Sequence, residues 1–315
     1  MAAAVGLAEG EAGVRAVVTA LARLEPVSIR RLSRAAELPV PIVAAICAEL
    51  RKRAVVARER PAQLTARGRE LFADGGLDLG GQACPCCSGR GVVLEGLRGV
   101  VRALARAALE APGPRLDLDQ CHCTVETKLR RVLAIHAADA LVGRRVLLLG
   151  DDDLISVAIR SVARHHGSGD TIAGLTVVDV DPELLRFLRR FAVCVRHDLR
   201  EPLPASLRGV FDTVVTDPPY TVEGARVFLS RAAEALDGAG DVFLSFGSRR
   251  PGAAFAVQRA IAECGFAIRS LERDFNEYVG AGALGGSSHL YHLTATDELR
   301  PVVTGRSRKP LYTAG

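Results

Sequence analysis

Three consecutive aspartates follow a short apolar run near the middle of the chain. The run at residues 146–149 leads into Gly150, and Asp151, Asp152 and Asp153 then precede a stretch with helical spacing of apolar residues. In a fold whose strands alternate with helices, this loop lies where a nucleotide cofactor places its phosphates. One aspartate can cap the following helix, but three adjacent carboxylates repel one another and also repel phosphate. We therefore expect the loop to receive an ammonium or sulfonium group.

The charge around this loop agrees with a cationic ligand. Residues 150–223 contain twelve Asp or Glu and eight Arg, a net charge of −4, and such a field favours a positive ligand. The loop carries neither the G-x-G-x-x-G nor the G-x-x-x-x-G-K-[ST] pattern. This argues against NAD, FAD and nucleoside triphosphates.

Two further aspartates follow the next apolar runs. Asp179 ends the second run, where folds of this kind place the acid that binds ribose hydroxyls. Asp181 is better suited to cap the next helix, because Pro182 follows it at the first helical position. Asp198 comes after the third run, where an acid could hold the amino group of adenine, although a local turn would explain it as well.

The fourth apolar run ends in Asp217-Pro218-Pro219-Tyr220. The prolines fix the backbone and remove N–H donors, which leaves the Asp217 carboxylate and the Pro218 carbonyl as rigid acceptors. Such acceptors suit an amine, and the ring of Tyr220 offers a face for a cation or a base. The alternative is a rigid turn after a strand, and the tetrapeptide does not by itself identify the amine.

The apolar runs beyond residue 120 predict an α/β fold. Short β-prone runs alternate with helix-like stretches, which is typical of a parallel sheet with crossover helices. We expect residues 120–298 to form a Rossmann-like catalytic domain, with a closing edge strand at residues 288–296. The basic residues 299–315 are expected to form a mobile tail.

The N-terminal part carries most of the positive charge. Residues 15–69 hold twelve Arg or Lys and four Glu, a net charge of +8 in a chain with a total of +5. Helical spacing occurs at residues 14–24, 28–37 and 40–53. Followed by a β-prone turn and another short helix, it predicts a winged-helix-like domain over residues 1–75. This domain could bind DNA, but we favour a role in dimerisation or as a lid. Residues 76–119 are expected to form a Gly- and Cys-rich linker and a helix.

Three groups of residues resemble one known family. They are Gly150-Asp151-Asp152-Asp153-Leu154-x-Ser156, Asp217-Pro218-Pro219-Tyr220-Thr221, and Asp119-Gln120 followed by Thr124-x-Glu126-Thr127. Together they are similar to the branched-chain polyamine synthases, the N4-bis(aminopropyl)spermidine synthases. The resemblance implies a winged-helix-like domain followed by a Rossmann-like domain of the class I methyltransferase and spermidine-synthase type. It also implies transfer of the aminopropyl group of decarboxylated S-adenosylmethionine to the secondary amine of spermidine, with release of methylthioadenosine.

The resemblance gives roles to the carboxylates. Asp152 becomes the candidate base, because a protonated amine must lose a proton before it can attack, and Asp217 and the Pro218 carbonyl would orient that amine. The residues expected to bind the donor are Gly150, Asp151, Asp179 and Asp198, and those expected to bind the acceptor are Asp153, Pro218, Tyr220 and Glu223. Glu223 could clamp a distal ammonium group, or it could simply be a charge at a helix N-terminus.

Cysteines and a glycine-rich segment leave two open questions. Cys84 and Cys87 form a C-x-x-C pair, and a second Cys pair surrounds His122, so a structural thiolate-bound metal is possible. A reduced turn is the alternative, and we do not expect a catalytic metal. Residues 275–278 with 280–286 could form a lid over the acceptor, or a hairpin loop before the last strand.

We expect a cytoplasmic enzyme. The N-terminus carries Glu9 and Glu11 and lacks the features of a signal peptide. No apolar run approaches the ~20 residues of a membrane span. The family resemblance suggests a homodimer. Two alternative functions are an S-adenosylmethionine-dependent N-methyltransferase acting on an amine or a nucleic acid base, and a winged-helix DNA-binding regulator that senses a polyamine.

Overall fold

The computed structural model describes residues 10–36, 38, 40–72, 93, 95–167, 171–247, 251–279 and 287–313. The chain divides into two compact units, Met1–Gly80 and Gly81–Gly315. The boundary falls in the Gly- and Cys-rich segment that the sequence predicts to be a linker. Among the helices within these ranges, none is long and apolar enough to cross a membrane.

The N-terminal unit contains the four helices that the sequence predicts, and the last of them is short. They are α2 (Gly10–Leu24), α3 (Ile29–Ala35), α4 (Val40–Lys52) and α5 (Ala66–Leu71). Antiparallel bridges join Val27 to Ala62 and Val56 to Leu64, and the apolar helix faces enclose a hydrophobic core. The elements follow the order of a winged helix, and the winged-helix assignment itself stays a prediction.

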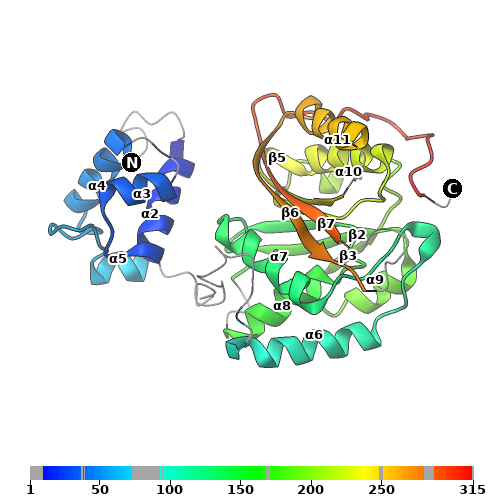
Figure 1. Cartoon of the computed structure of the whole chain (residues 1–315), viewed down its shortest axis with the longest axis horizontal. Helices are drawn as coiled ribbons and strands as arrows, with labels where there is room; N and C mark the ends of the chain where they lie inside the picture. Colours follow the sequence, from blue (N-terminus) through cyan, green and yellow to red (C-terminus); the bar gives the residue numbers. More distant parts are fainter. Residues whose placement is uncertain are drawn as a thin grey trace. The chain divides into compact units, whose positions relative to one another are not determined.

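The C-terminal unit is built on one seven-stranded sheet with the order β3-β2-β1-β4-β5-β7-β6 (Figure 1). The strands are β1 (Arg145–Leu149), β2 (Gly174–Asp179), β3 (Val193–Arg196), β4 (Phe211–Thr216), β5 (Leu236–Phe246), β6 (Phe266–Glu277) and β7 (Ser287–Ala295). Strands β3, β2, β1, β4 and β5 run parallel, whereas β7 is antiparallel to both β5 and β6. The α/β prediction is confirmed, with a mixed rather than a purely parallel sheet.

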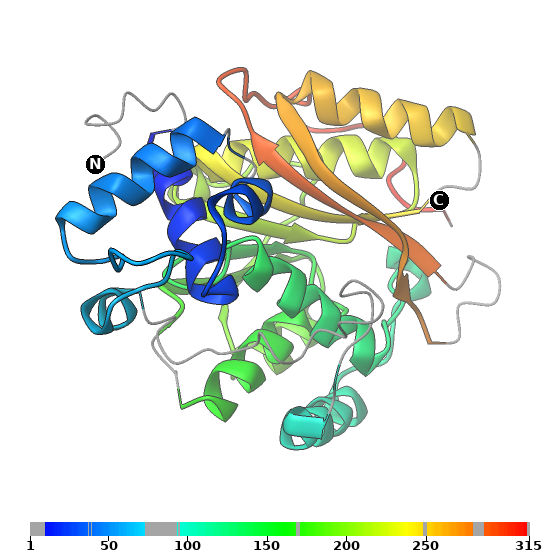
Figure 2. The same ribbon diagram turned by 60° about the vertical axis from the view of Figure 1, so that its left-hand side comes forward.

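The antiparallel end of the sheet differs from the sequence-based expectation. The sequence predicts the edge strand at residues 288–296, but β7 lies between β5 and β6, and β6 forms the edge. Figure 2 shows β6 and β7, in orange, as long adjacent strands. The sequence does not reveal β6, because residues 267–271 are all exposed, Ile268 and Leu271 included, and the strand therefore lacks the alternation of buried and exposed side chains that marks a half-buried strand.

Helices cover both faces of the sheet. They are α6 (Arg98–Glu110), α7 (Val125–Ala137), α8 (Ile155–His165), α9 (Pro182–Leu188), α10 (Val222–Ala235) and α11 (Pro251–Glu263), with short 3-10 turns at Glu95–Leu97, Leu116–Leu118 and Ala205–Leu207. Figure 1 shows α10 and α11 on one face and α6, α7 and α8 on the other. Helix α8 connects β1 to β2, and α10 connects β4 to β5. Because these strands run parallel, their carboxyl ends lie at the same edge of the sheet.

The C-terminal residues 299–313 pack against this unit and are not the mobile tail that the sequence predicts. Leu311 is buried in the hydrophobic core, and Val303 packs against the same core. Arg231, on α10, donates hydrogen bonds to the carbonyls of Val303 and Gly305, both at 2.9 Å. The prediction from charge is corrected because the segment also carries apolar side chains that complete the core.

Replacing Arg231 with methionine should release this segment. The guanidinium is fully buried and pairs with Glu234 at 2.5 Å, so its removal leaves a buried carboxylate unpaired. We expect the free energy of unfolding to fall by about 3–5 kcal/mol, and limited proteolysis within residues 299–313 to become faster. The control Arg300→Met removes an exposed arginine and should change stability by less than about 0.5 kcal/mol. Unchanged stability and unchanged proteolysis of Arg231→Met would show that apolar contacts alone hold the segment.

Candidate active site

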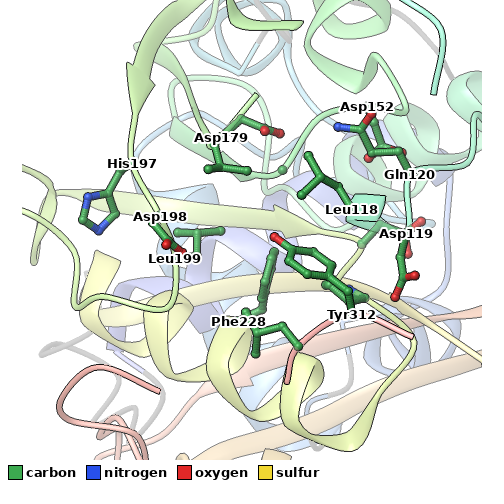
Figure 3. A pocket seen from close by; sticks show the side chains of 15 residues that line it. Leu118, Asp119, Gln120, Asp152, Asp179, His197, Asp198, Leu199, Phe228 and Tyr312 are labelled. Carbon is green, nitrogen blue, oxygen red and sulfur yellow. The ribbon is translucent and has the colours of Figure 1, made fainter. Parts of the chain in front are cut away.

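A cavity lies at the edge of the sheet where the parallel strands end (Figure 3). Its walls come from the loops after β1, β2, β3 and β4, from the segment before α7, from α10 and from the C-terminal segment. The lining residues are Leu118, Asp119, Gln120, Gly150, Asp152, Asp179, Val180, His197, Asp198, Leu199, Asp217, Pro219, Phe228, Leu311 and Tyr312. Of the residues predicted from the sequence, Gly150, Asp152, Asp179, Asp198 and Asp217 are in this set. The fold thus gathers acids from four separate strand ends.

Asp151 caps a helix and is not among the residues that line the cavity. Its carboxylate accepts hydrogen bonds from the N–H groups of Ile155 at 2.6 Å and Ser156 at 3.2 Å, and from the Ser156 hydroxyl. Burial raises the pKa of this carboxyl to about 7. Asp151 therefore acts as the helix cap that the sequence offers as an alternative, and its contact with the donor stays a prediction.

Asp152 is the member of the aspartate triplet that lines the cavity. The chain turns sharply just before it, at Gly150, whose φ of +73° suits glycine. One carboxylate oxygen of Asp152 accepts a hydrogen bond from the N–H of Cys121 at 3.0 Å. Burial, followed by the negative charges of Asp153 and Asp217, raises the pKa of Asp152 well above its usual range. A carboxylate with a raised pKa beside a cavity is suited to accept a proton.

Asp153 is held by a buried arginine instead of facing the cavity. Its carboxylate accepts hydrogen bonds from Arg131, on α7, at 2.6 Å and from the N–H of Cys123, also at 2.6 Å. Although burial opposes ionisation, the charges of Arg131 and Lys128 lower the pKa of Asp153. Asp153 is therefore an ionised partner of Arg131, and its contact with the acceptor stays a prediction.

Asp217 lines the cavity and shares the same arginine. Arg131 donates to its carboxylate at 2.9 Å, and the hydroxyl of Tyr278 donates to it at 2.6 Å. Burial raises the pKa of Asp217 to about 7, while Arg131 acts in the opposite direction and Asp153 adds to the rise. This carboxyl can change its charge near neutral pH.

Asp179 lies at the end of β2, where the sequence predicts the ribose ligand. Its carboxylate accepts hydrogen bonds from the N–H groups of Asp181 at 2.8 Å and Asp151 at 3.4 Å, and burial raises its pKa to about 6. Asp181 accepts a hydrogen bond from the N–H of Glu183 at 2.9 Å and caps α9, as predicted. The side chain of Gln120 donates to Asp181 at 3.5 Å and lines the cavity beside it.

Asp198 also lines the cavity, but an arginine already occupies its carboxylate. The Arg200 side chain donates to both oxygens, at 3.0 and 2.6 Å. Burial opposes ionisation, but these hydrogen bonds lower the pKa of Asp198. An adenine amino group would have to share the carboxylate with Arg200, a partner that the sequence analysis does not consider.

Three residues predicted to bind the acceptor are not in the lining: Pro218, Tyr220 and Glu223. The neighbouring Pro219 lines the cavity in place of Pro218. The Tyr220 ring packs edge-on against Tyr278, with 6.3 Å between centroids, and forms an aromatic layer behind Asp217. Glu223 lies in the first turn of α10, as its alternative role predicts, and its carboxylate accepts a hydrogen bond from the Ser307 hydroxyl at 2.9 Å; its role as an ammonium clamp stays a prediction.

Several residues of the site are missing from the sequence-based set: Gln120, Arg131, Tyr278, Leu311 and Tyr312. The sequence could have indicated Gln120 as a site residue, because it belongs to one of the motifs that carry the family resemblance. Tyr278 follows β6 and forms an isolated bridge with Cys123. Residues 280–286 lie outside the described residues, and the lid stays a prediction. No pattern in the sequence indicates that Arg131 belongs to the site, because an arginine on an amphipathic helix is usually exposed to solvent.

Of the two Cys pairs, the structure describes the one that surrounds His122. Cys84 and Cys87 lie outside the described residues. Over the ranges that the structure describes, no group of three His, Cys, Asp or Glu side chains could hold a metal ion. The N–H groups of Cys121 and Cys123 bind the aspartate triplet, and burial raises the pKa of the Cys121 thiol to about 11. Residues 121–123 thus position the carboxylates of Asp152 and Asp153 through their backbone N–H groups.

Comparisons with known proteins identify the family of this chain. The family model described as the branched-chain polyamine synthase A C-terminal domain matches residues 100–293. The N(4)-bis(aminopropyl)spermidine synthase of Thermococcus kodakarensis is 33% identical over 267 residues, which cover 80% of this chain and 74% of that protein. An uncharacterised protein of Methanocaldococcus jannaschii is 33% identical over 301 residues, covering 91% of this chain and 74% of its own length.

A solved structure extends the likeness to three dimensions. It is the branched-chain polyamine synthase of Thermus thermophilus in complex with N4-aminopropylspermidine and 5'-methylthioadenosine. It is 25% identical, has a TM-score of 0.62, and the match covers 99% of this chain and 95% of that one. This likeness, the family model and the curated relatives agree, and the chain belongs to the branched-chain polyamine synthase family.

Proposed function

We propose that this protein transfers the aminopropyl group of decarboxylated S-adenosylmethionine to the secondary amine of spermidine, giving a branched polyamine and methylthioadenosine. As a member of its family it is an aminopropyltransferase, a polyamine synthase. The observation that carries the proposal is one cavity lined by Asp152, Asp179 and Asp217, each placed by a different strand. The ligands of the T. thermophilus relative are a polyamine and the nucleoside that such a reaction releases.

The charges of the cavity favour the decarboxylated donor. Asp179 can accept hydrogen bonds from ribose hydroxyls at the end of β2. The N-terminus of α8 is already capped by Asp151, so it is not available to an anionic group. S-adenosylmethionine would bring a carboxylate near these acids, whereas the decarboxylated donor brings only a sulfonium and an ammonium group.

The acceptor amine needs a base and an orienting group. Asp152 removes the proton from the secondary amine, and Asp217 orients the nitrogen. The nitrogen lone pair forms a bond to the methylene carbon of the aminopropyl group that is attached to sulfur. The bond between this carbon and sulfur breaks, and sulfur keeps the electron pair as a neutral thioether. The reaction needs no chemical group beyond the base, so much of the rate comes from holding the attacking nitrogen, the carbon and the leaving sulfur in line.

Other expectations stay predictions at this point. They are the homodimer, the cytoplasmic location, and a role of the N-terminal unit in dimerisation or as a lid. A structural metal at Cys84 and Cys87 and a DNA contact of the N-terminal unit stay open alternatives. None of them is required for the transfer.

The reaction itself can be tested with two donors. Purified protein is incubated with spermidine and either S-adenosylmethionine or its decarboxylated form, and amines and nucleosides are identified by mass spectrometry. We expect methylthioadenosine and a product heavier by one or two aminopropyl groups from the decarboxylated donor only. Methylated spermidine from S-adenosylmethionine would instead support the methyltransferase alternative.

Replacing Asp152 with asparagine should remove the base while preserving the shape of the side chain. We expect kcat to fall by about 10²–10⁴-fold, the range of a lost general base, with little change in Tm. Asp297→Asn is the matched control, because Asp297 is exposed and distant in the fold from the cavity lining. A kcat of Asp152→Asn within threefold of the parent would exclude Asp152 as the base.

Binding of a polyamine should release protons. Burial raises the pKa of Asp179 to about 6 and that of Asp217 to about 7, so the empty cavity carries protons at mildly acidic pH. A bound ammonium group favours the ionised carboxylates, and the affinity for spermidine should therefore rise between about pH 5.5 and 8. Calorimetry in two buffers with different ionisation enthalpies should report net proton release near pH 6.5, and a smaller release for Asp217→Asn. Net proton uptake would contradict this account.

A further inference from the structure

We propose that Arg131 is a positioning residue of the aminopropyl transfer: it holds Asp153 and Asp217 as its ion-pair partners and so leaves Asp152 as the carboxylate that takes the proton. Arg131 is not among the residues that line the cavity, so it would act through the two carboxylates that it holds. This inference rests on the proposed function.

The geometry around Arg131 supports this role. Its side chain is 2% exposed, and its guanidinium donates to Asp153 at 2.6 Å, to Asp217 at 2.9 Å and to the amide oxygen of Asn276 at 2.8 Å. A fourth hydrogen bond reaches the hydroxyl of Tyr278 at 3.1 Å. One planar group thus fixes the loop after β1, the loop after β4 and the end of β6 relative to one another.

Packing alone does not explain a buried arginine at this position. A buried ion pair contributes less to stability than apolar side chains of similar volume would, because both ions must lose their water. Arg131 forms pairs with two carboxylates, one behind the cavity and one in its wall. This arrangement is explained if the ionisation of Asp217 controls how strongly the cavity binds its ligand.

The charged and titratable groups around Asp217 come from several elements. They are Arg131 from α7, Asp152 and Asp153 from the loop after β1, Cys121 before α7, Tyr220 from its own loop and Tyr278 after β6. Arg131 is the cation of this set. It opposes the rise in the pKa of Asp217 that burial and Asp153 cause.

Loss of Arg131 should therefore change the pH dependence of the enzyme as well as its rate. Without the cation, Asp217 and Asp153 stay protonated to higher pH, and a neutral Asp217 cannot hold an ammonium group. The acidic limb of the pH profile of kcat/KM for spermidine should move upward by about one pH unit or more. A residue that only stabilises the fold would lower activity by the same factor at every pH.

The test compares Arg131→Met, Arg131→Lys and the control Lys128→Met. Lys128 lies one turn earlier on α7 and is equally buried, but its ammonium group donates to the Cys123 carbonyl at 2.8 Å and forms no ion pair with Asp217. Lys128→Met removes the same charge from the same helix. Because Lys128 acts on Asp153 and is not among the groups that shift the pKa of Asp217, its acidic limb should move clearly less than that of Arg131→Met. Each variant is checked for folding by circular dichroism and Tm.

For Arg131→Met we expect kcat/KM to fall at least tenfold at pH 7 and the deficit to shrink at pH 9. Arg131→Lys should keep the acidic limb near its original position, because the charge remains, and should lose about tenfold in kcat, because an ammonium group cannot reproduce the planar fork. A pH profile of Arg131→Met parallel to that of the parent would overturn the inference. If Arg131→Met does not fold, Arg131→Lys serves as the test. A kcat of Arg131→Lys within twofold of the parent value would then overturn the inference.

The inference and the proposed function can fail separately. If the parent protein forms no branched polyamine, the proposed function is wrong. Calorimetric titration of spermidine into the parent and Arg131→Met between pH 6 and 9 then decides the inference, which requires that weakened binding in the variant recovers as the pH rises. Parallel affinity curves would overturn it.

Discussion

The cavity must attract cations, and so the protein must bury several carboxylates close together without losing its fold. Each buried negative charge is costly unless a cation or hydrogen-bond donors compensate it. Arg131 provides that compensation from behind the cavity by binding two of the carboxylates at once. This one guanidinium joins α7 to the exit loops of β1 and β4 and to the end of β6.

The three adjacent aspartates show how one short loop serves several needs. Asp151 satisfies the N-terminus of α8, Asp153 binds Arg131, and Asp152 lies in the cavity wall. Successive side chains in a tight turn point in different directions, so three neighbouring carboxylates need not act on one ligand. The same charge pattern therefore contains a helix cap, an ion-pair partner and a candidate base.

Local chemistry could be predicted from the sequence, and distant partners could not. Asp179 and Asp217 were identifiable because strand ends in an alternating α/β pattern converge at one edge. The Asp181 cap was identifiable from Pro182. Arg131, by contrast, acts through contacts with residues far away in the sequence, and the burial of Leu311 depends on the core that it completes. Such pairings are set by the folded surface, which no local pattern encodes.

The titration behaviour of the cavity follows from the same balance between burial and charge. Burial raises the pKa of Asp217 to about 7 and that of Asp179 to about 6, while Arg131 lowers that of Asp153. An empty cavity can hold protons in place of cations, which limits the repulsion among its acids. When a polyamine arrives, its ammonium groups replace those protons, and the cavity acquires its full negative charge only while a cation is present to balance it. The acids can thus be dense enough to select a cationic donor and acceptor without destabilising the free protein to the same extent.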